Sequence, residues 1–314
     1  MNAFEKHGIF KDDNKKSVIL GTDWGSDCDD CVAVRILCRA HKDGIIDLKG
    51  INIDACMEKS VPSLHKFVLN EGVESLPIGI DLEATDFGGH ENVNDSWYQY
   101  EILRDADREY MSNEEAMEGV KLYRKILAEA EGKVDLVEVG FMQVLADLLK
   151  SSPDEYSDKN GLELVRDKVD TFWAMAGKWD QENGWEYNLA SSKRTIAGGK
   201  YVIENWPTKI VFLGFECGES VITGGKSVLD ENDLLQRAMT AYKCENGRCS
   251  WDPMTVVLMI ADIEKAGYKA VRGTASLDEN GLNNFKEETN GKHYYVRKLN
   301  EDKWYENFIN DLIV

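Results

Sequence analysis

Short apolar runs alternate with longer amphipathic segments along most of this chain. Six runs have the length and composition of strands: 17–23, 46–54, 76–80, 134–140, 171–177 and 209–215. Between them, apolar residues recur every three to four positions, as in helices, at 30–42, 58–70, 114–130, 141–150, 190–204 and 230–242. Ser112 and Glu115 have the spacing of a capping box at the start of one of these helices.

This alternation predicts an α/β fold. Strands that alternate with helices form a mostly parallel open sheet, and right-handed crossovers place helices on both of its faces. No repeat, low-complexity segment or linker divides the chain, so we expect a single domain over residues 1–314. Within it we expect a flexible N-terminal tail at 1–16 and a hairpin-like C-terminal addition at about 266–314.

Charge and hydropathy exclude two classes of partner. The 314 residues include 57 acidic and 37 basic ones, which gives a net charge of −20. Nucleic acid is therefore not an expected partner, because binding it requires clustered Lys and Arg. No apolar run reaches the ~18 residues of a membrane helix, and the polar N-terminus has no apolar signal core. We expect a cytoplasmic protein that forms a homo-oligomer, either a dimer or a tetramer.

The seven cysteines do not indicate a disulfide framework, because their number is odd and the chain is long. Cys28 and Cys31 form a C-x-x-C motif, but Asp29 and Asp30 lie between them. Two carboxylates disfavour the thiolate that a redox pair needs, and a four-thiolate zinc site would require a second such motif. We therefore expect buried, reduced cysteines.

The most unusual stretch is GTDWGSDCDDCVAV at 21–34, between the first strand and the first helix. Four carboxylates fall within eight positions here: Asp23, Asp27, Asp29 and Asp30. One or two of them are explained as acids that cap the N-terminus of the helix. The others would repel one another without a compensating charge. A hard divalent cation, calcium or magnesium, supplies that charge, since such ions bind carboxylate and carbonyl oxygens.

Other acidic motifs do not match. If Asp27 were the first position of an EF-hand loop, Val32 would stand at the required glycine and Cys38 at the required glutamate.

In an α/β sheet, ligands bind beyond the carboxyl ends of the strands. The 21–30 turn, the segment after Asp54 and the segment after Val139 are therefore expected on one rim.

The stretch TDWGSDCDD, followed by a helix, resembles the signature of the inosine–uridine-preferring nucleoside hydrolases. These calcium-dependent enzymes carry D-T-D-x-G-x-D-D or a slightly longer form, and Gly21 stands here in place of the first Asp. Four further segments resemble the family in the same order: 48–60, 134–149, 184–192 and 250–260. The resemblance covers about residues 17 to 265 and implies a divergent member with the nucleoside-hydrolase fold.

The resemblance also implies roles for individual residues. Asp23, Asp30, Asp252 and the carbonyl of Val139 would bind Ca²⁺, and Asp27 would be a further ligand or an acceptor behind them. Asp29 would be the general base, and Glu186 and Asn188 would hold the ribose hydroxyls. Each has a simpler alternative: Asp252 precedes Pro253 and could cap a helix at 253–264, and Glu186 and Asn188 could be ordinary polar loop residues.

The departures from the family lie on the leaving-group side. Trp251 replaces a His associated with protonation of the base, and Met57 replaces an Asn. Trp251 could stack on an aromatic leaving group or belong to the core. His90, in a Gly-rich loop after the third strand, is the best candidate for the missing acid, although a lone loop His is more often simply exposed.

The implied function is calcium-dependent hydrolysis of the N-glycosidic bond of a ribonucleoside to ribose and free base, as in purine or pyrimidine salvage. Two alternatives stay open. The chain could act on a different ribosylated substrate with another leaving group, or it could bind a nucleoside or ribose without turnover.

Overall fold

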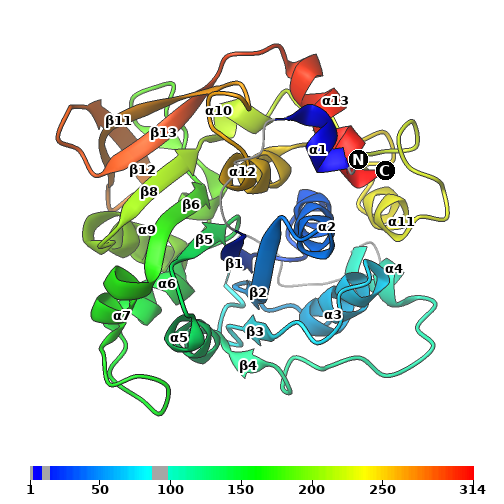
Figure 1. Ribbon diagram of the computed structural model, residues 1–314, viewed down its shortest axis with the longest axis horizontal. Coiled ribbons are helices and arrows are strands. Elements are labelled where there is room, and N and C mark those ends of the chain that lie inside the picture. The colour runs from blue at the N-terminus through cyan, green and yellow to red at the C-terminus, as the bar shows by residue number, and fades with distance from the viewer. Residues whose placement is uncertain (1–2, 9–14, 87–97) are drawn as a thin grey trace.

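A computed structural model describes residues 3–8, 15–86 and 98–314 (Figure 1). Within these residues, eleven strands form one sheet in the order β4-β3-β2-β1-β5-β6-β8-β13-β11-β12-β7. All neighbours from β4 to β13 are parallel, and the pairs from β13 to β7 are antiparallel. The predicted mostly parallel α/β sheet is therefore confirmed.

The strands of this sheet are β1 (Lys16–Thr22), β2 (Ile46–Ile53), β3 (Ile78–Ile80), β4 (Met117–Glu118), β5 (Val134–Glu138), β6 (Val169–Met175), β7 (Gly184–Trp185), β8 (Lys209–Leu213), β11 (Tyr268–Leu277), β12 (Leu282–Glu287) and β13 (His293–Lys298). A separate short pair consists of β9 (Ile222–Thr223) and β10 (Arg248–Cys249). The six predicted strands all occur, with ends within two residues of the expected ones.

The helices are α1 (Ala3–His7), α2 (Asp29–Lys42), α3 (Ser60–Asn70), α4 (Tyr98–Leu103), α5 (Gly119–Glu129), α6 (Gln143–Lys150), α7 (Gly161–Lys168), α8 (Tyr187–Ala190), α9 (Lys193–Asn205), α10 (Phe215–Gly218), α11 (Leu234–Ala241), α12 (Trp251–Ile260) and α13 (Asp302–Ile313). Helices α2, α3, α12 and α13 cover one face of the sheet, and α5, α6, α7 and α9 cover the other (Figure 1). Successive residues of β1 point into the two cores in turn: Val18 and Leu20 into one, Ile19 into the other.

Three local expectations differ from the structure. Glu115 accepts a hydrogen bond from the Ser112 amide at 2.8 Å, but this pair lies in a turn and not at a helix start. The helix begins only at Gly119, capped by Glu118, because residues 117–118 first pair with β3 as β4. Residues 3–7, expected to be flexible, form α1, and Phe4 is buried. The C-terminal segment contains the expected hairpin, β11–β12, but β13 also joins it to β8 in the main sheet.

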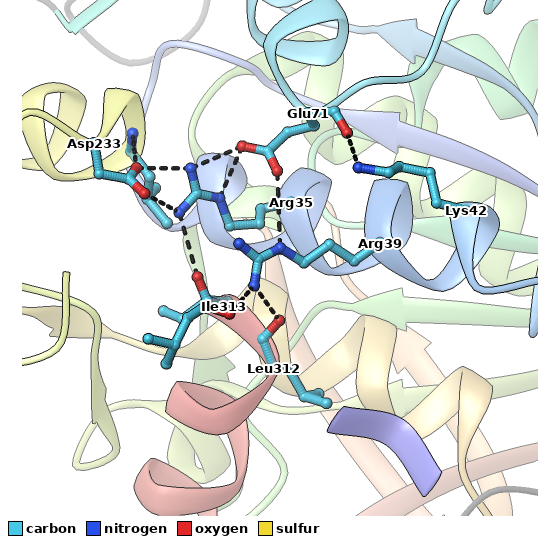
Figure 2. Close-up of polar contacts among 9 residues, drawn as sticks. Arg35, Arg39, Lys42, Glu71, Asp233, Leu312 and Ile313 are labelled. Carbon is cyan, nitrogen blue, oxygen red and sulfur yellow. Dashed lines mark hydrogen bonds and ion pairs between the residues drawn. The ribbon is translucent and has the colours of Figure 1, made fainter. Parts of the chain in front are cut away.

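A buried arginine fixes helix α2, whose first residues are Asp29 and Asp30. Arg35 donates to Glu71 at the end of α3, to Asp233 at the N-cap of α11 and to the carbonyl of Ile313 in α13, at 2.7 to 3.3 Å (Figure 2). Arg39, one turn further along, donates to carbonyls at the end of α13. Arg35 thereby ties the helix that carries the acid cluster to three elements distant in sequence.

Candidate active site

The loop between β1 and α2 is held by its uncharged residues. Gly25 has φ +119°, a conformation that side chains disfavour. The indole of Trp24 is buried and donates to the hydroxyl of Ser63 at 2.8 Å. The Ser26 hydroxyl donates to the carboxylate of Asp23, and its amide donates to the Asp23 carbonyl at 3.0 Å. These contacts turn the chain so that its acids face inward at the carboxyl end of β1.

Three carboxylates from distant parts of the sequence meet at this point. Asp29, Asp30 and Asp252 each offer a carboxylate oxygen, and these oxygens lie within 4.8 Å of one another. Asp29 accepts the backbone N–H of Asp252 at 3.1 Å, and the Thr22 hydroxyl donates to Asp30. The second oxygen of Asp30 is buried and has no hydrogen-bond partner among the described residues. The predicted proximity of Asp30 and Asp252 is thus present in the structure.

Burial makes the charged forms of these acids costly. It raises the pKa of Asp23 to about 7, and the neighbouring Asp27 adds to the shift. It raises the pKa of Asp29, Asp30 and Asp252 well above the usual range, and each is raised further by the nearby carboxylates. A positive charge placed among these oxygens would remove both causes, because it replaces lost hydration and offsets the mutual repulsion.

The donor set suits a hard cation such as calcium. It consists of carboxylate oxygens and the carbonyl of Val139. One of these oxygens, Oδ2 of Asp30, has no hydrogen-bond partner among the described residues. The carbonyl of Val139 lines a cavity together with Asp23, Asp29 and Asp252. That carbonyl accepts one hydrogen bond, from the Asn188 amide at 2.8 Å, and keeps a second lone pair. Asp27 lies differently from the others: both of its oxygens accept from Arg248 Nε, at 2.9 and 3.0 Å. Because both of its oxygens already accept from Arg248, Asp27 suits the predicted role of a hydrogen-bond acceptor behind the ligands better than the role of a ligand.

The predicted ribose-binding residues follow β7 and lie next to the Val139 carbonyl, to which the Asn188 side chain donates. Glu186 is buried and accepts the backbone N–H groups of Gly177, Asn188 and Leu189 at 3.0, 2.7 and 3.3 Å. Burial raises its pKa to about 7. Glu186 therefore does cap a short helix, α8, but it and Asn188 also line the cavity that contains Asp23 and Asp252.

These residues surround a cavity of about 300 Å³ at the carboxyl ends of the parallel strands. Its wall includes four aromatic residues, Tyr187, Phe215, Tyr242 and Trp251. The ring of Trp251 stacks on Phe215 at 5.2 Å between centroids, and the guanidinium of Arg248 lies over it at 5.3 Å. Trp251 is only partly buried, so its ring belongs to the cavity wall as well as to the packing. The wall therefore combines aromatic rings with carboxylates and a side-chain amide.

Sequence reasoning missed three features of the site. Tyr187 lines the cavity, and its hydroxyl is buried without a hydrogen-bond partner among the described residues. Its place between Glu186 and Asn188 was the available signal. Arg248 was not recognised, because nothing in the sequence pairs it with Asp27. Asp54 and Glu138, a buried acid pair behind the cavity, were also missed as chemistry. His90, the predicted acid, lies outside the described residues.

Comparisons with known proteins agree with this geometry at the level of the fold. No family model matches the chain, and no curated protein matches its sequence. Among solved structures, it resembles an inosine–uridine-preferring nucleoside hydrolase from Bacillus anthracis, with TM-score 0.67 and 14% identity over 95% of this chain and 99% of that one. A purine-preferring ribonucleoside hydrolase from Gardnerella vaginalis gives TM-score 0.67 and 14% identity over 95% and 98%.

This chain has the nucleoside-hydrolase fold. A third structure with that similarity is the type III effector protein XopQ complexed with adenosine diphosphate ribose, at TM-score 0.67 and 13% identity over 99% of this chain and 96% of that one. The structures match nearly full-length, so the fold shared with nucleoside hydrolases extends over almost the whole chain. In the part of the chain that the structure describes, none of the helices has the length and apolar character needed to cross a bilayer.

Proposed function

We propose that this protein is a calcium-dependent N-glycosidase that hydrolyses a ribonucleoside to ribose and free base. The observation that carries the proposal is the convergence of Asp29, Asp30 and Asp252 within 4.8 Å beside a cavity whose lining also includes a buried Glu–Asn pair and aromatic rings. A nucleoside likewise combines a polyhydroxylated sugar with a flat base.

Asp23, Asp30, Asp252 and the Val139 carbonyl would hold the ion. When bound, calcium orients a water molecule and makes it more acidic. Asp29 takes the proton of the attacking water, because its carboxylate lies within the acid cluster and its pKa is raised by burial, which makes it a better base. Glu186 and Asn188 orient the ribose so that its anomeric carbon faces Asp29. The positive charge that develops on the ribose is stabilised by the surrounding carboxylates.

Departure of the base requires either a proton or a stable anion. Trp251 and Phe215, which stack on each other in the cavity wall, would offer an aromatic surface to the base. Two groups are candidates for the proton donor: the unpaired hydroxyl of Tyr187, and His90. Tyr187 also has the simpler role of donating a hydrogen bond to the substrate without transferring its proton.

One observation favours a second candidate substrate. Arg248 lines the cavity beside Trp251, its side chain 31% exposed, and so places a cation next to the aromatic wall. A ribosylated substrate that carries phosphate groups, such as adenosine diphosphate ribose, would use this cation. Product analysis alone distinguishes a protein that binds a nucleoside without turnover from a hydrolase of either substrate.

The experiment is an assay of released reducing sugar from a panel of purine and pyrimidine nucleosides; for adenosine diphosphate ribose, which is itself a reducing sugar, release of free adenine is measured instead. Each substrate is incubated with the protein in calcium chloride and in excess EDTA. We expect sugar release from at least one nucleoside, lost in EDTA and restored by added calcium. Binding of a nucleoside by calorimetry without any sugar release would instead support the binding protein.

A further inference from the structure

Gly21 and Glu138 face each other on neighbouring strands near the acid cluster. They are register partners in the parallel pair β1–β5. A Cβ atom built on Gly21 would lie 2.0 Å from Oε2 and 2.4 Å from Cδ of Glu138. No side chain at position 21 can coexist with the present Glu138 conformation, because these distances are far below van der Waals contact. The carboxylate of Glu138 therefore occupies, from β5, the space that a side chain from β1 would take.

Glu138 and Asp54 together hold the turn after β5. Glu138 Oε1 accepts the N–H of Gly140 at 3.2 Å, and Asp54 Oδ1 accepts the N–H of Phe141 at 3.0 Å. Both acids are almost completely buried, at 1% and 0% exposure. Two successive amides are thus bound by two carboxylates. Holding both amides fixes the peptide planes of this turn, and with them the direction of the Val139 carbonyl.

The turn is also packed tightly against the loop of the acid cluster. A Cβ atom on Gly140 would lie 2.4 Å from the backbone nitrogen of Asp23 and 2.6 Å from Asp54 Oδ1. A displacement of the turn would therefore move the Val139 carbonyl relative to Asp23. The two segments that contribute the predicted backbone and side-chain ligands are in direct contact, with Glu138 and Asp54 behind them.

Two ionisable groups are buried side by side here, which is costly, so their presence calls for a role beyond packing. Residues that orient metal ligands from behind are commonly hydrogen-bonded carboxylates, and their loss typically weakens metal affinity about 10–100-fold.

We propose that Glu138 is a positioning residue for the calcium site: its carboxylate fills, from β5, the place of a side chain at position 21 and, with Asp54, orients the Val139 carbonyl toward the acid cluster. This inference rests on the metal site of the proposed function. The proposal also explains Gly21. In the family an acid stands at this position, directly before the segment 22–30. Here the carboxylate of Glu138 fills the space from the neighbouring strand.

The test measures calcium affinity by isothermal titration calorimetry, with melting temperature in EDTA as the measure of folding. Glu138→Ala should weaken calcium binding about 10–100-fold. Adding Gly21→Asp to that variant returns a carboxylate to the same space from β1 and should bring the affinity to within about fivefold of wild type. The matched control, Gly21→Ala with Glu138→Ala, fills part of the space without a carboxylate and should stay weak.

Three results would overturn the proposal: unchanged affinity in Glu138→Ala, no recovery with Gly21→Asp in a folded double variant, or equal recovery in the Gly21→Ala control. If the double variants do not fold, Glu138→Asp and Glu138→Gln decide. The shorter acid should lose about tenfold in affinity and the isosteric amide less than threefold, and the reverse order refutes positioning. A wild-type protein that binds no calcium would refute the metal site itself, whereas wild-type binding that is insensitive to residue 138 refutes only the role of Glu138.

Discussion

Calcium should stabilise this protein more at alkaline than at acidic pH. The reason is the sign of the shifts at the acid cluster. Burial raises the folded-state pKa of Asp23 from 3.8 to about 7. Between these two values the folded chain binds more protons than the unfolded chain, so the free energy of unfolding falls as pH rises. Bound calcium removes this cost, because it compensates the carboxylate charge.

The size of the effect follows from the shift at Asp23. One pKa unit corresponds to about 1.4 kcal/mol, so a move from 3.8 to about 7 costs the metal-free protein up to about 4 kcal/mol by pH 8. For domains of roughly 150–250 residues, 1 kcal/mol changes Tm by about 2–4 °C. About two of these pKa units, or about 2.7 kcal/mol, lie between pH 5 and pH 8, so a drop of roughly 5–10 °C over this range is expected in EDTA. Glu186, with its pKa raised to about 7 by burial, acts in the same direction.

The assay is thermal unfolding followed by intrinsic fluorescence from pH 5 to pH 8, in EDTA and in calcium chloride. The two curves should diverge as pH rises, with the larger calcium-induced gain at pH 8. Asp23→Asn is the matched control: it cannot ionise, so its curve in EDTA should be flatter than that of wild type. A metal-free Tm that is constant or rises over this range, or an equal calcium effect at both ends, would refute the reasoning.

Three further variants test other parts of the account. Arg35→Met should lower the free energy of unfolding by about 3–5 kcal/mol in urea denaturation, since it removes the nearest ionic partner of the buried Glu71. The side chain of Arg39 is 27% exposed, so Arg39→Met should lower the free energy of unfolding clearly less. Equal losses would contradict the anchoring role of Arg35. Trp251→Ala should raise KM for a purine nucleoside about tenfold, from lost stacking, and Trp251→Phe should recover most of it; an unchanged KM would assign Trp251 to packing alone. His90→Ala and Tyr187→Phe test the two candidate proton donors. The substitution that removes the donor should slow inosine hydrolysis roughly 10²–10⁴-fold and leave hydrolysis of a nitrophenyl riboside nearly unchanged. Equal loss on both substrates points to a structural role.

The sequence was sufficient for the sheet because its strands are short apolar runs bounded by polar turns. The segment 134–140, for example, is apolar enough to be buried on both faces, and it forms β5 at 134–138. The start of α5 was missed because residues 117–118 pair with β3, a contact between distant segments that local patterns do not encode. Phe4 lies in a polar stretch, and only tertiary packing shows that it is buried.

For the site, the sequence identified residues at strand ends but not their partners. The family resemblance implied that Asp252 lies near Asp23 and Asp30 at a metal site, and the structure brings Asp252 together with Asp30 and Asp29. The pairing of Asp27 with Arg248 spans 221 positions and has no local signal. The contact between Gly21 and Glu138 likewise cannot be predicted without the register of β1 and β5, because neither residue alone is unusual in a strand.

The most direct test of the central claim is proton NMR of inosine incubated with calcium-loaded wild-type protein and with Asp29→Asn. The account predicts that wild type converts inosine, or another nucleoside of the panel, to free ribose and free base in equal amounts. Asp29→Asn should bind calcium with similar affinity and release neither product. Ribose release by Asp29→Asn at the wild-type rate would contradict the role of Asp29, and a wild type that binds calcium and nucleoside but releases no ribose would contradict the claim that this protein is a nucleoside hydrolase.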